Sequence, residues 1–168
     1  MLRRLAPLVV LLLAVAGGFV AGKVDGGGDD GSGGVARVVR VVDGDTILVS
    51  LGAREERVRY IGVDTPETVK PGAPVECFGK KASARNKELV AGRRVRLVRD
   101  AEERDRYGRL LAYVYRADDG VFVNAALVRD GYAEPLTIPP NVAHAGELAS
   151  LARAARHAGR GLWNACSR

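Results

Sequence analysis

The sequence has little cysteine and little histidine, the side chains that most often bind zinc in proteins. Its 168 residues include two cysteines, Cys77 and Cys166, and two histidines, His144 and His157. Both histidines fall in a stretch with a helical pattern, and neither has the short spacing to a cysteine that zinc sites use. The sequence therefore argues against a zinc centre. It also contains no internal repeat, and its length fits a single folded domain.

The first 34 residues lack the pattern of a folded element. Arg3 and Arg4 precede an uncharged run over residues 5–22, which is typical of an export segment. It predicts either a signal peptide with the small-x-small sequence Ala14-Val15-Ala16, or an uncleaved anchor, because eighteen uncharged residues nearly reach the length of a membrane span. A buried core helix is a poor alternative, since glycines would weaken it and no polar face is present.

Residues 23–34 are almost entirely glycine, aspartate and serine, so they predict a flexible linker. We therefore expect three parts: a signal peptide or anchor over residues 1–22, this linker, and a folded domain over residues 35–168. The expected location is extracytoplasmic, either secreted or anchored to the cytoplasmic membrane by residues 5–22. In an exported protein Cys77 and Cys166 favour a disulfide, although two separate thiols remain the alternative.

The charge balance is basic but not extreme. Lysine and arginine exceed aspartate and glutamate by 26 to 20, for a formal net charge of +6. Loss of Arg3 and Arg4 with a leader would lower this charge from +6 to +4. A basic protein suits a polyanionic partner, yet many basic proteins bind no nucleic acid, so the charge gives weak support to such a partner.

Short apolar stretches separated by turn residues predict a mixed α+β fold. The Asp43-Gly44 turn joins the first two stretches into a hairpin, and Asn124 is a candidate N-cap for a short helix. Leu148, Leu151, Ala152 and Ala155 form one apolar stripe on the last helix. The predicted strands are 35–42, 46–51, 57–63, 94–98, 110–115 and a short piece near Val121, and the predicted helices are 80–90, 124–129 and 145–158. This order fits a five-stranded antiparallel barrel of the oligonucleotide-binding (OB) type with about three packed helices.

Two acidic motifs predict a site for a hard cation. Asp43-Gly44-Asp45-Thr46 alone could be only a hairpin turn, and Asp64-Thr65-Pro66 alone could be only the end of a strand. Together, the carboxylates of Asp45 and Asp64 and the backbone carbonyl of Thr65 offer three oxygen ligands and leave positions for water and a phosphate. Calcium suits a loose site better than magnesium does, but these residues do not fix the ion.

Three further side chains complete the chemistry of phosphodiester hydrolysis. Glu67 lies three residues beyond Asp64 and is the candidate general base. Arg59, on the preceding strand, and Arg109, after a Tyr107-Gly108 turn, can donate paired hydrogen bonds to phosphate oxygens. Either arginine alone would be read as a solvated surface residue, so the prediction depends on the combination.

These motifs resemble the staphylococcal nuclease (thermonuclease) family. The similarity runs through Asp43-Gly44-Asp45-Thr46, the stretch 59–67, and Asp105-Arg106-Tyr107-Gly108-Arg109, and it continues to Gly161-Leu162-Trp163. The resemblance implies an OB barrel with three helices, a calcium ion, and hydrolysis of DNA and RNA that leaves 3′-phosphate ends. It places metal ligands at Asp45, Asp64 and Thr65, the general base at Glu67, and phosphate-binding arginines at Arg59 and Arg109.

The resemblance also places contacts to a terminal phosphate at Arg106 and Tyr107. The sequence departs from the family prototype at Leu136-Thr137-Ile138-Pro139-Pro140, where the prototype has tyrosines that line a base pocket. Stacking on a base is therefore expected to be reduced. We expect a monomeric endonuclease acting on DNA and RNA. A catalytically inactive nucleic-acid-binding module is the alternative, although the acids and arginines that such a module would lose are all present.

Overall fold

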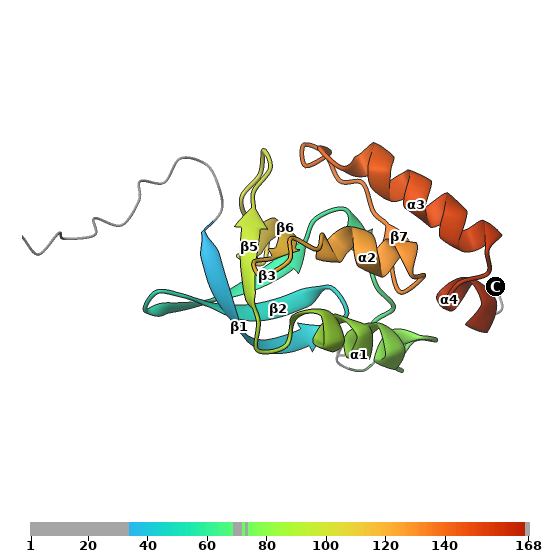
Figure 1. Ribbon diagram of the computed structural model, residues 1–168, viewed down its shortest axis with the longest axis horizontal. Helices are drawn as coiled ribbons and strands as arrows, with labels where there is room; N and C mark the ends of the chain where they lie inside the picture. The colour runs from blue at the N-terminus through green and yellow to red at the C-terminus, as the bar shows by residue number, and fades with distance from the viewer. Residues whose placement is uncertain (1–33, 69–71, 73, 167–168) are drawn as a thin grey trace, which may run out of the picture.

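Five strands form a closed barrel at the centre of the molecule (Figure 1). The computed structural model describes residues 34–68, 72 and 74–166, so the expected export segment and nearly all of the linker lie outside the described residues. The strand order around the barrel is β1-β2-β3-β6-β5. The bounds are β1 (Val35–Asp43), β2 (Thr46–Leu51), β3 (Arg54–Tyr60), β5 (Arg94–Val98) and β6 (Leu110–Arg116). The expected barrel is confirmed, and one pairing differs: β3 and β6 are parallel, with Val58 opposite Leu110.

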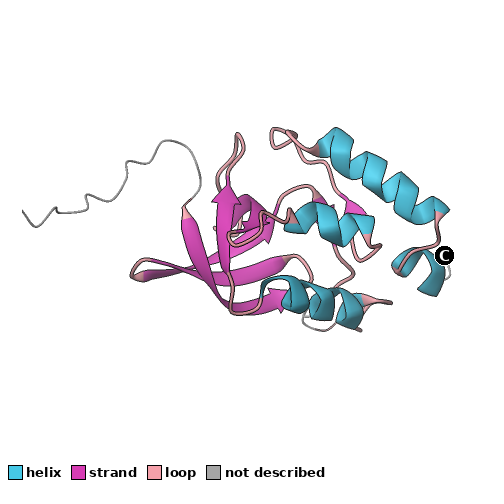
Figure 2. Cartoon of the chain, in the orientation of Figure 1, coloured by secondary structure: helices cyan, strands magenta, loops and turns pink. Residues whose placement is uncertain are grey.

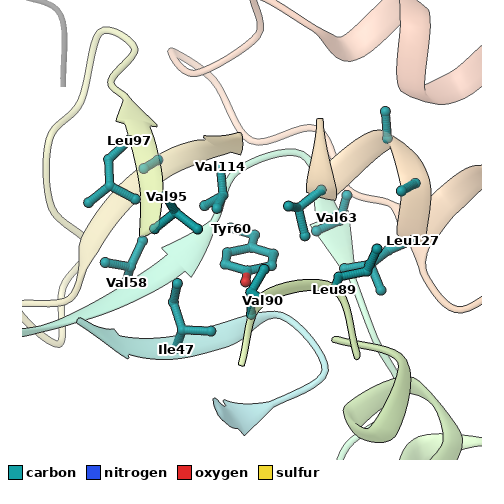
Figure 3. Close-up of a cluster of buried hydrophobic side chains, with 14 of the residues drawn as sticks. Ile47, Val58, Tyr60, Val63, Leu89, Val90, Val95, Leu97, Val114 and Leu127 are labelled. Atoms are coloured by element: carbon teal, nitrogen blue, oxygen red, sulfur yellow. The ribbon is translucent and has the colours of Figure 1, made fainter. Parts of the chain in front are cut away.

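Alternation of side chains along the strands fills the barrel with aliphatic residues. In β1, Ala36 and Val38 are buried while Val35 and Arg37 are exposed, as period-two alternation requires. Tyr60 lies in the middle of the core cluster (Figure 3), and its hydroxyl donates to Asn86 Oδ1 at 2.9 Å. Residues around it from the strands and helices include Ile47, Val58, Val63, Leu89, Val90, Val95, Leu97, Val114 and Leu127.

Helices cover one side of the barrel (Figure 2). They are α1 (Gly79–Val90), α2 (Val123–Arg129), α3 (Ala145–His157) and α4 (Leu162–Ala165). The predicted apolar stripe of α3 is confirmed, because Leu148, Ala152 and Ala155 are buried and Leu151 packs against the core. None of the helices among the described residues combines the length and the apolar character that crossing a membrane requires.

The prediction that Asn124 caps α2 is wrong. Phe122 is the N-cap, and Asn124 lies inside the helix with its side chain fully buried. The Asn124 amide donates to the carbonyl of Ile61 at 2.8 Å, and its oxygen accepts the N–H of Val114 at 2.9 Å. The Asn124 side chain, predicted to cap the helix, therefore bonds instead to two buried backbone groups outside the helix.

The strand expected near Val121 is reduced to an isolated bridge between Tyr115 and Phe122.

The strand predicted over residues 57–63 is divided, because β3 ends at Tyr60 and a turn at residues 61–62 separates it from the short strand β4 (Val63–Asp64); the sequence did not predict β7 (Glu134–Pro135). β4 pairs with β7, and this pairing places Asp64 opposite Glu134.

A disulfide joins Cys77, just before α1, to Cys166, just after α4, with their Cα atoms 5.9 Å apart. The predicted pairing of the two cysteines is thus present in the structure.

Candidate active site

The β1–β2 turn holds Asp45 against the segment that follows β4. Asp45 Oδ2 accepts the backbone N–H and the hydroxyl of Thr65, each at 3.0 Å. Gly44 permits this contact, because a Cβ atom at Gly44 would lie 2.5 Å from Thr65 Oγ1. Both Asp45 and Thr65 are buried. The structure therefore brings together two of the three predicted metal-binding residues.

Arg59, from the end of β3, lies between the two predicted acidic ligands. Its Nη2 is 3.2 Å from Asp45 Oδ2 and 2.9 Å from Asp64 Oδ1. Its Nη1 donates to the carbonyls of Tyr60 at 2.8 Å and Val63 at 2.7 Å. Three hydrogen bonds, an ion pair with Asp45 and a side chain only 14% exposed fix the position of this guanidinium.

The donor set fits a hard divalent cation. The carboxylates of Asp45 and Asp64 converge on one nitrogen of Arg59, so they lie close enough to share a single positive charge. Burial raises the pKa of Asp64, Arg59 opposes the rise, and the neighbouring carboxylate of Asp45 adds to it. Among the described residues no three acidic, histidine or cysteine side chains gather into a metal site, so a third protein ligand would be a backbone oxygen such as that of Thr65.

Glu67 lies beside a second buried carboxyl group, that of Asp43. The Oε1 atom of Glu67 accepts the N–H of Thr68 at 2.9 Å, and the Thr68 hydroxyl donates to Asp43 Oδ1 at 2.6 Å. Burial raises the pKa of Asp43 to about 6; the Thr68 hydrogen bond lowers it, and a hydrogen bond with Glu67 raises it. Asp43 was not among the predicted site residues, although its place in the Asp43-Gly44-Asp45 turn was a signal for it.

The backbone of Glu67 is held by Glu76. The Glu67 N–H donates to Glu76 Oε2, and the Glu76 N–H donates to the carbonyl of Glu67, both at 3.0 Å. Glu76 precedes the disulfide-bonded Cys77. The disulfide that connects this segment to the end of α4 therefore lies one residue from Glu76, which holds the backbone of the candidate base Glu67.

Both predicted phosphate-binding arginines line one pocket of about 520 Å³. Arg109 is oriented by Asp105, whose carboxylate accepts Arg109 Nε at 2.7 Å and the backbone N–H groups of Tyr107 and Arg109. Burial alone would raise the pKa of Asp105, but these hydrogen bonds outweigh it and hold the pKa below its usual value. The turn from Asp105 to Arg109 is thus fixed by one carboxylate.

Arg106 and Tyr107 lie at the same pocket and interact with each other. Arg106 Nη2 donates to the Tyr107 hydroxyl at 2.7 Å, and the Tyr107 ring is flanked by the guanidinium groups of Arg106 and Arg109 at 4.8 and 5.5 Å. Tyr107 is 68% exposed. Both side chains are therefore accessible to a ligand.

The pocket also has aliphatic lining residues. Leu136, Ile138 and Leu111 contribute to its lining. Asn141 also lines it, and its amide makes two hydrogen bonds to the backbone of Glu102, at 2.7 and 3.0 Å. Neither Asn141 nor Glu102 was predicted as a site residue, because a contact across 39 residues leaves no local pattern in the sequence.

Comparison with known proteins identifies the family to which the chain is similar. Residues 57–165 match the family model described as staphylococcal nuclease homologue. The chain is 50% identical over 104 residues to a protein named Thermonuclease from Staphylococcus intermedius, covering 62% of this chain and 61% of that protein. It is 39% identical over 128 residues to Thermonuclease from Staphylococcus hyicus, covering 76% and 75%.

A third relative is Endonuclease YncB of Bacillus subtilis (strain 168), 50% identical over 95 residues. That match covers 56% of this chain and 44% of YncB. The chain thus spans less than two thirds of the Staphylococcus intermedius protein and less than half of YncB.

Proposed function

The chain belongs to the staphylococcal nuclease homologue family, and on this basis we propose that it is a calcium-dependent endonuclease. Its substrates are DNA and RNA, and its products end in 3′-phosphates. The observation that carries the proposal is the position of Arg59, which contacts the acidic pair Asp45 and Asp64 and also lines the pocket with Arg109. A phosphodiester in that pocket would lie beside both an arginine clamp and the candidate cation site.

Asp45, Asp64 and the carbonyl of Thr65 would hold the calcium ion. When bound, the ion supplies positive charge that offsets the charge of the phosphate. Arg59 and Arg109 donate hydrogen bonds to the non-bridging phosphate oxygens and stabilise the negative charge that develops as water adds to phosphorus. Both guanidinium groups are oriented in advance by their carboxylate partners, so little reorganisation is needed.

Glu67 acts as the general base. It accepts a proton from the attacking water, the water oxygen bonds to phosphorus, and the bond from phosphorus to the 5′ oxygen breaks. The 5′ oxygen leaves and takes a proton from solvent, so the phosphate stays on the 3′ end. Arg106 and Tyr107, which are exposed at the pocket, bind a neighbouring or terminal phosphate.

We propose an extracytoplasmic location for the enzyme. Two features support it: the export pattern of residues 5–22 and the Cys77–Cys166 disulfide. Disulfides persist mainly in oxidising compartments. Cell fractionation with an antibody to the folded domain tests this, and protein found only in the cytoplasm would contradict it.

A cleavage assay tests the nuclease proposal. The full chain is incubated with single-stranded DNA and with RNA, first with calcium, then with excess chelator, then with calcium restored. We expect cleavage only when calcium is present, and products whose 3′ ends are dephosphorylated by a phosphatase. DNA that is bound but never cut would support the binding module instead, and cutting in chelator would remove the metal from the mechanism.

A further inference from the structure

The pairing of β1 with β5 places arginines opposite each other on the outer face of the barrel. Arg37 is the Cα partner of Arg94, and Arg96 lies opposite Val35. Ala36 and Val95, the partners between them, are 1% and 0% exposed. Because successive residues of a strand face opposite sides of the sheet, the three arginines must point to solvent.

The basic surface continues along the neighbouring strands. Arg40 on β1 is opposite Leu48 on β2, which in turn is opposite Arg57 on β3, and both arginines are exposed. We name this surface the arginine strip: Arg37, Arg40, Arg57, Arg94 and Arg96. None of these five residues lines the 520 Å³ pocket. β1 and β5 lie side by side on the part of the barrel away from α3 and α4 (Figure 1).

Like charges directly opposite each other destabilise a strand pair. Elsewhere the fold offsets its arginines with acids: Arg93 pairs with Asp118 at 2.6 Å, and Arg104 pairs with Glu56 at 3.0 Å. Within the described part of the chain, no arginine of the strip makes an ion pair. Glu55 shares this face of the sheet, since it lies opposite Ser50 and two residues before Arg57 on β3, so one acid stands against five arginines. The strip therefore carries positive charge that its own sheet does not neutralise.

The strip ends at an aromatic stack. The Arg96 guanidinium lies 4.4 Å from the centroid of the Tyr115 ring, and Tyr115 stacks on Phe122 with centroids 4.5 Å apart. Guanidinium planes and aromatic rings are the surfaces on which unpaired bases stack, and arginine forks match phosphate oxygens. A membrane surface fits less well, because the apolar residues on this face of β1 are Val35 and Val39 rather than the large side chains that insert into lipid.

We propose that the arginine strip is a second, sequence-independent binding site for the backbone of single-stranded nucleic acid, distinct from the catalytic pocket. This inference rests on the nucleic-acid substrate of the proposed function. The strip holds a long chain by its phosphates while another part of the same chain occupies the pocket. Long substrates are then bound more tightly than substrates that fill only the pocket.

The test measures binding without cutting, so its outcome does not depend on catalysis. Affinity of the full chain for a 30-nucleotide single-stranded DNA is measured by fluorescence anisotropy in chelator over a range of salt concentrations. Each phosphate contact contributes about 0.7 to the slope of log affinity against log salt for single strands. We expect the double variant Arg37→Gln/Arg94→Gln to reduce that slope by about 1.4, and its affinity at low salt to fall about tenfold or more.

A matched control removes the same charge elsewhere. Lys87 on α1 and Arg153 on α3 are exposed and lie on helices, so Lys87→Gln/Arg153→Gln is expected to change the slope by less than about 0.5. The melting temperature of Arg37→Gln/Arg94→Gln should equal or exceed that of the parent, because the substitution relieves repulsion between the two strands. With calcium, the ratio of kcat/KM for the 30-mer to that for a trinucleotide should fall in the same variant.

Two results would overturn the proposal. One is a slope for Arg37→Gln/Arg94→Gln that equals the slope of the parent or of the control. The other is a selective loss of binding to vesicles containing anionic lipid with DNA binding intact, which would assign the strip to a membrane surface.

Discussion

Arg59 and Arg109 line the same pocket, but the fold depends on them to different degrees. Arg59 contacts two backbone carbonyls and two carboxylates, whereas Arg109 pairs with the carboxylate of Asp105. Removing Arg59 would take this partner from the two backbone carbonyls and from the buried carboxylate of Asp45, while the Arg109 pair is partly exposed and contributes little. Substitution of Arg109 should therefore affect catalysis with little effect on stability, whereas substitution of Arg59 should affect both.

We predict that Arg109→Ala lowers turnover by about 10² or more and changes the free energy of unfolding by less than about 1 kcal/mol. Arg59→Ala should lower turnover as strongly and also lower the free energy of unfolding by about 2–4 kcal/mol. Lysine should rescue either position poorly because it lacks the planar fork. Single-turnover kinetics and urea unfolding measure the two effects. Parent-like turnover in both lysine variants would end the phosphate-clamp assignment.

Glu67 is the residue on which the proton transfer depends. Glu67→Gln keeps the size of the side chain and removes its ability to accept a proton, so turnover should fall by about 10² to 10⁴. Binding of DNA should persist, because glutamine leaves Arg59 and Arg109 in place. Rapid-quench kinetics with saturating calcium is the measurement. A variant that cuts at nearly the parent rate would show that another group takes the proton.

At the scale of elements, Asn124 connects α2 to two other segments of the core. Its side chain bonds to the backbone of Ile61 and of Val114. Asn124→Ala leaves both buried backbone groups without that partner, which costs about 1–3 kcal/mol for each group. We predict that the free energy of unfolding, measured with urea, falls by about 2–6 kcal/mol. Asn86→Ala is an informative comparison, because the same kind of amide joins α1 to Tyr60 and to the carbonyl of Asp43.

Asn124→Ala should lower the free energy of unfolding and leave the turnover of the folded enzyme unchanged. A variant with parent stability would mean that water replaces the amide at both groups. Reduced turnover in a variant that remains folded under assay conditions would instead indicate that Ile61, which lines the pocket, has moved.

The helices and strands that were predicted correctly from the sequence are those with a local pattern of apolar and turn residues. The valine-rich stretch 35–42 and the Asp43-Gly44 turn predicted the hairpin of β1 and β2, and the apolar stripe of α3 predicted its buried face. The strands β4 and β7 are two residues long, too short for periodicity, and the parallel pairing of β3 with β6 depends on contacts between distant segments. Asn124 was misassigned because its partners lie 10 and 63 residues away.

The candidate site shows the same limit. The motif residues Asp45, Arg59, Asp64 and Thr65 come together as expected, since they lie on neighbouring strand ends and short turns. The Asn141–Glu102 contact is visible only in the folded chain. Asp43 belongs to a motif that the sequence shows, but its burial beside Glu67 depends on the fold. Roles in catalysis and metal binding remain predictions for all of these residues.

At the scale of the whole molecule, one disulfide links the middle of the chain to its C-terminal region. The Cys77–Cys166 disulfide spans 89 residues and ties α4 to the segment that holds Glu67 through Glu76. In the chain-entropy model, a ring of that length stabilises the fold by about 4–5 kcal/mol, an upper figure because residual structure in the unfolded state reduces it. The bond should therefore contribute both to stability and to the position of the candidate base.

We predict that Cys77→Ser/Cys166→Ser lowers the melting temperature by roughly 10 °C. Because Glu76 would be less restrained, turnover should fall more than affinity for DNA does.

Replacing both cysteines avoids a free thiol that could dimerise. The control is the parent protein assayed with and without reductant, and reduction should lower its melting temperature and turnover as the double substitution does. Mass spectrometry of protein from an oxidising compartment, alkylated without reductant, checks the premise. Two alkylated cysteines would show that the bond does not form, and an unchanged melting temperature would show that the fold does not depend on it.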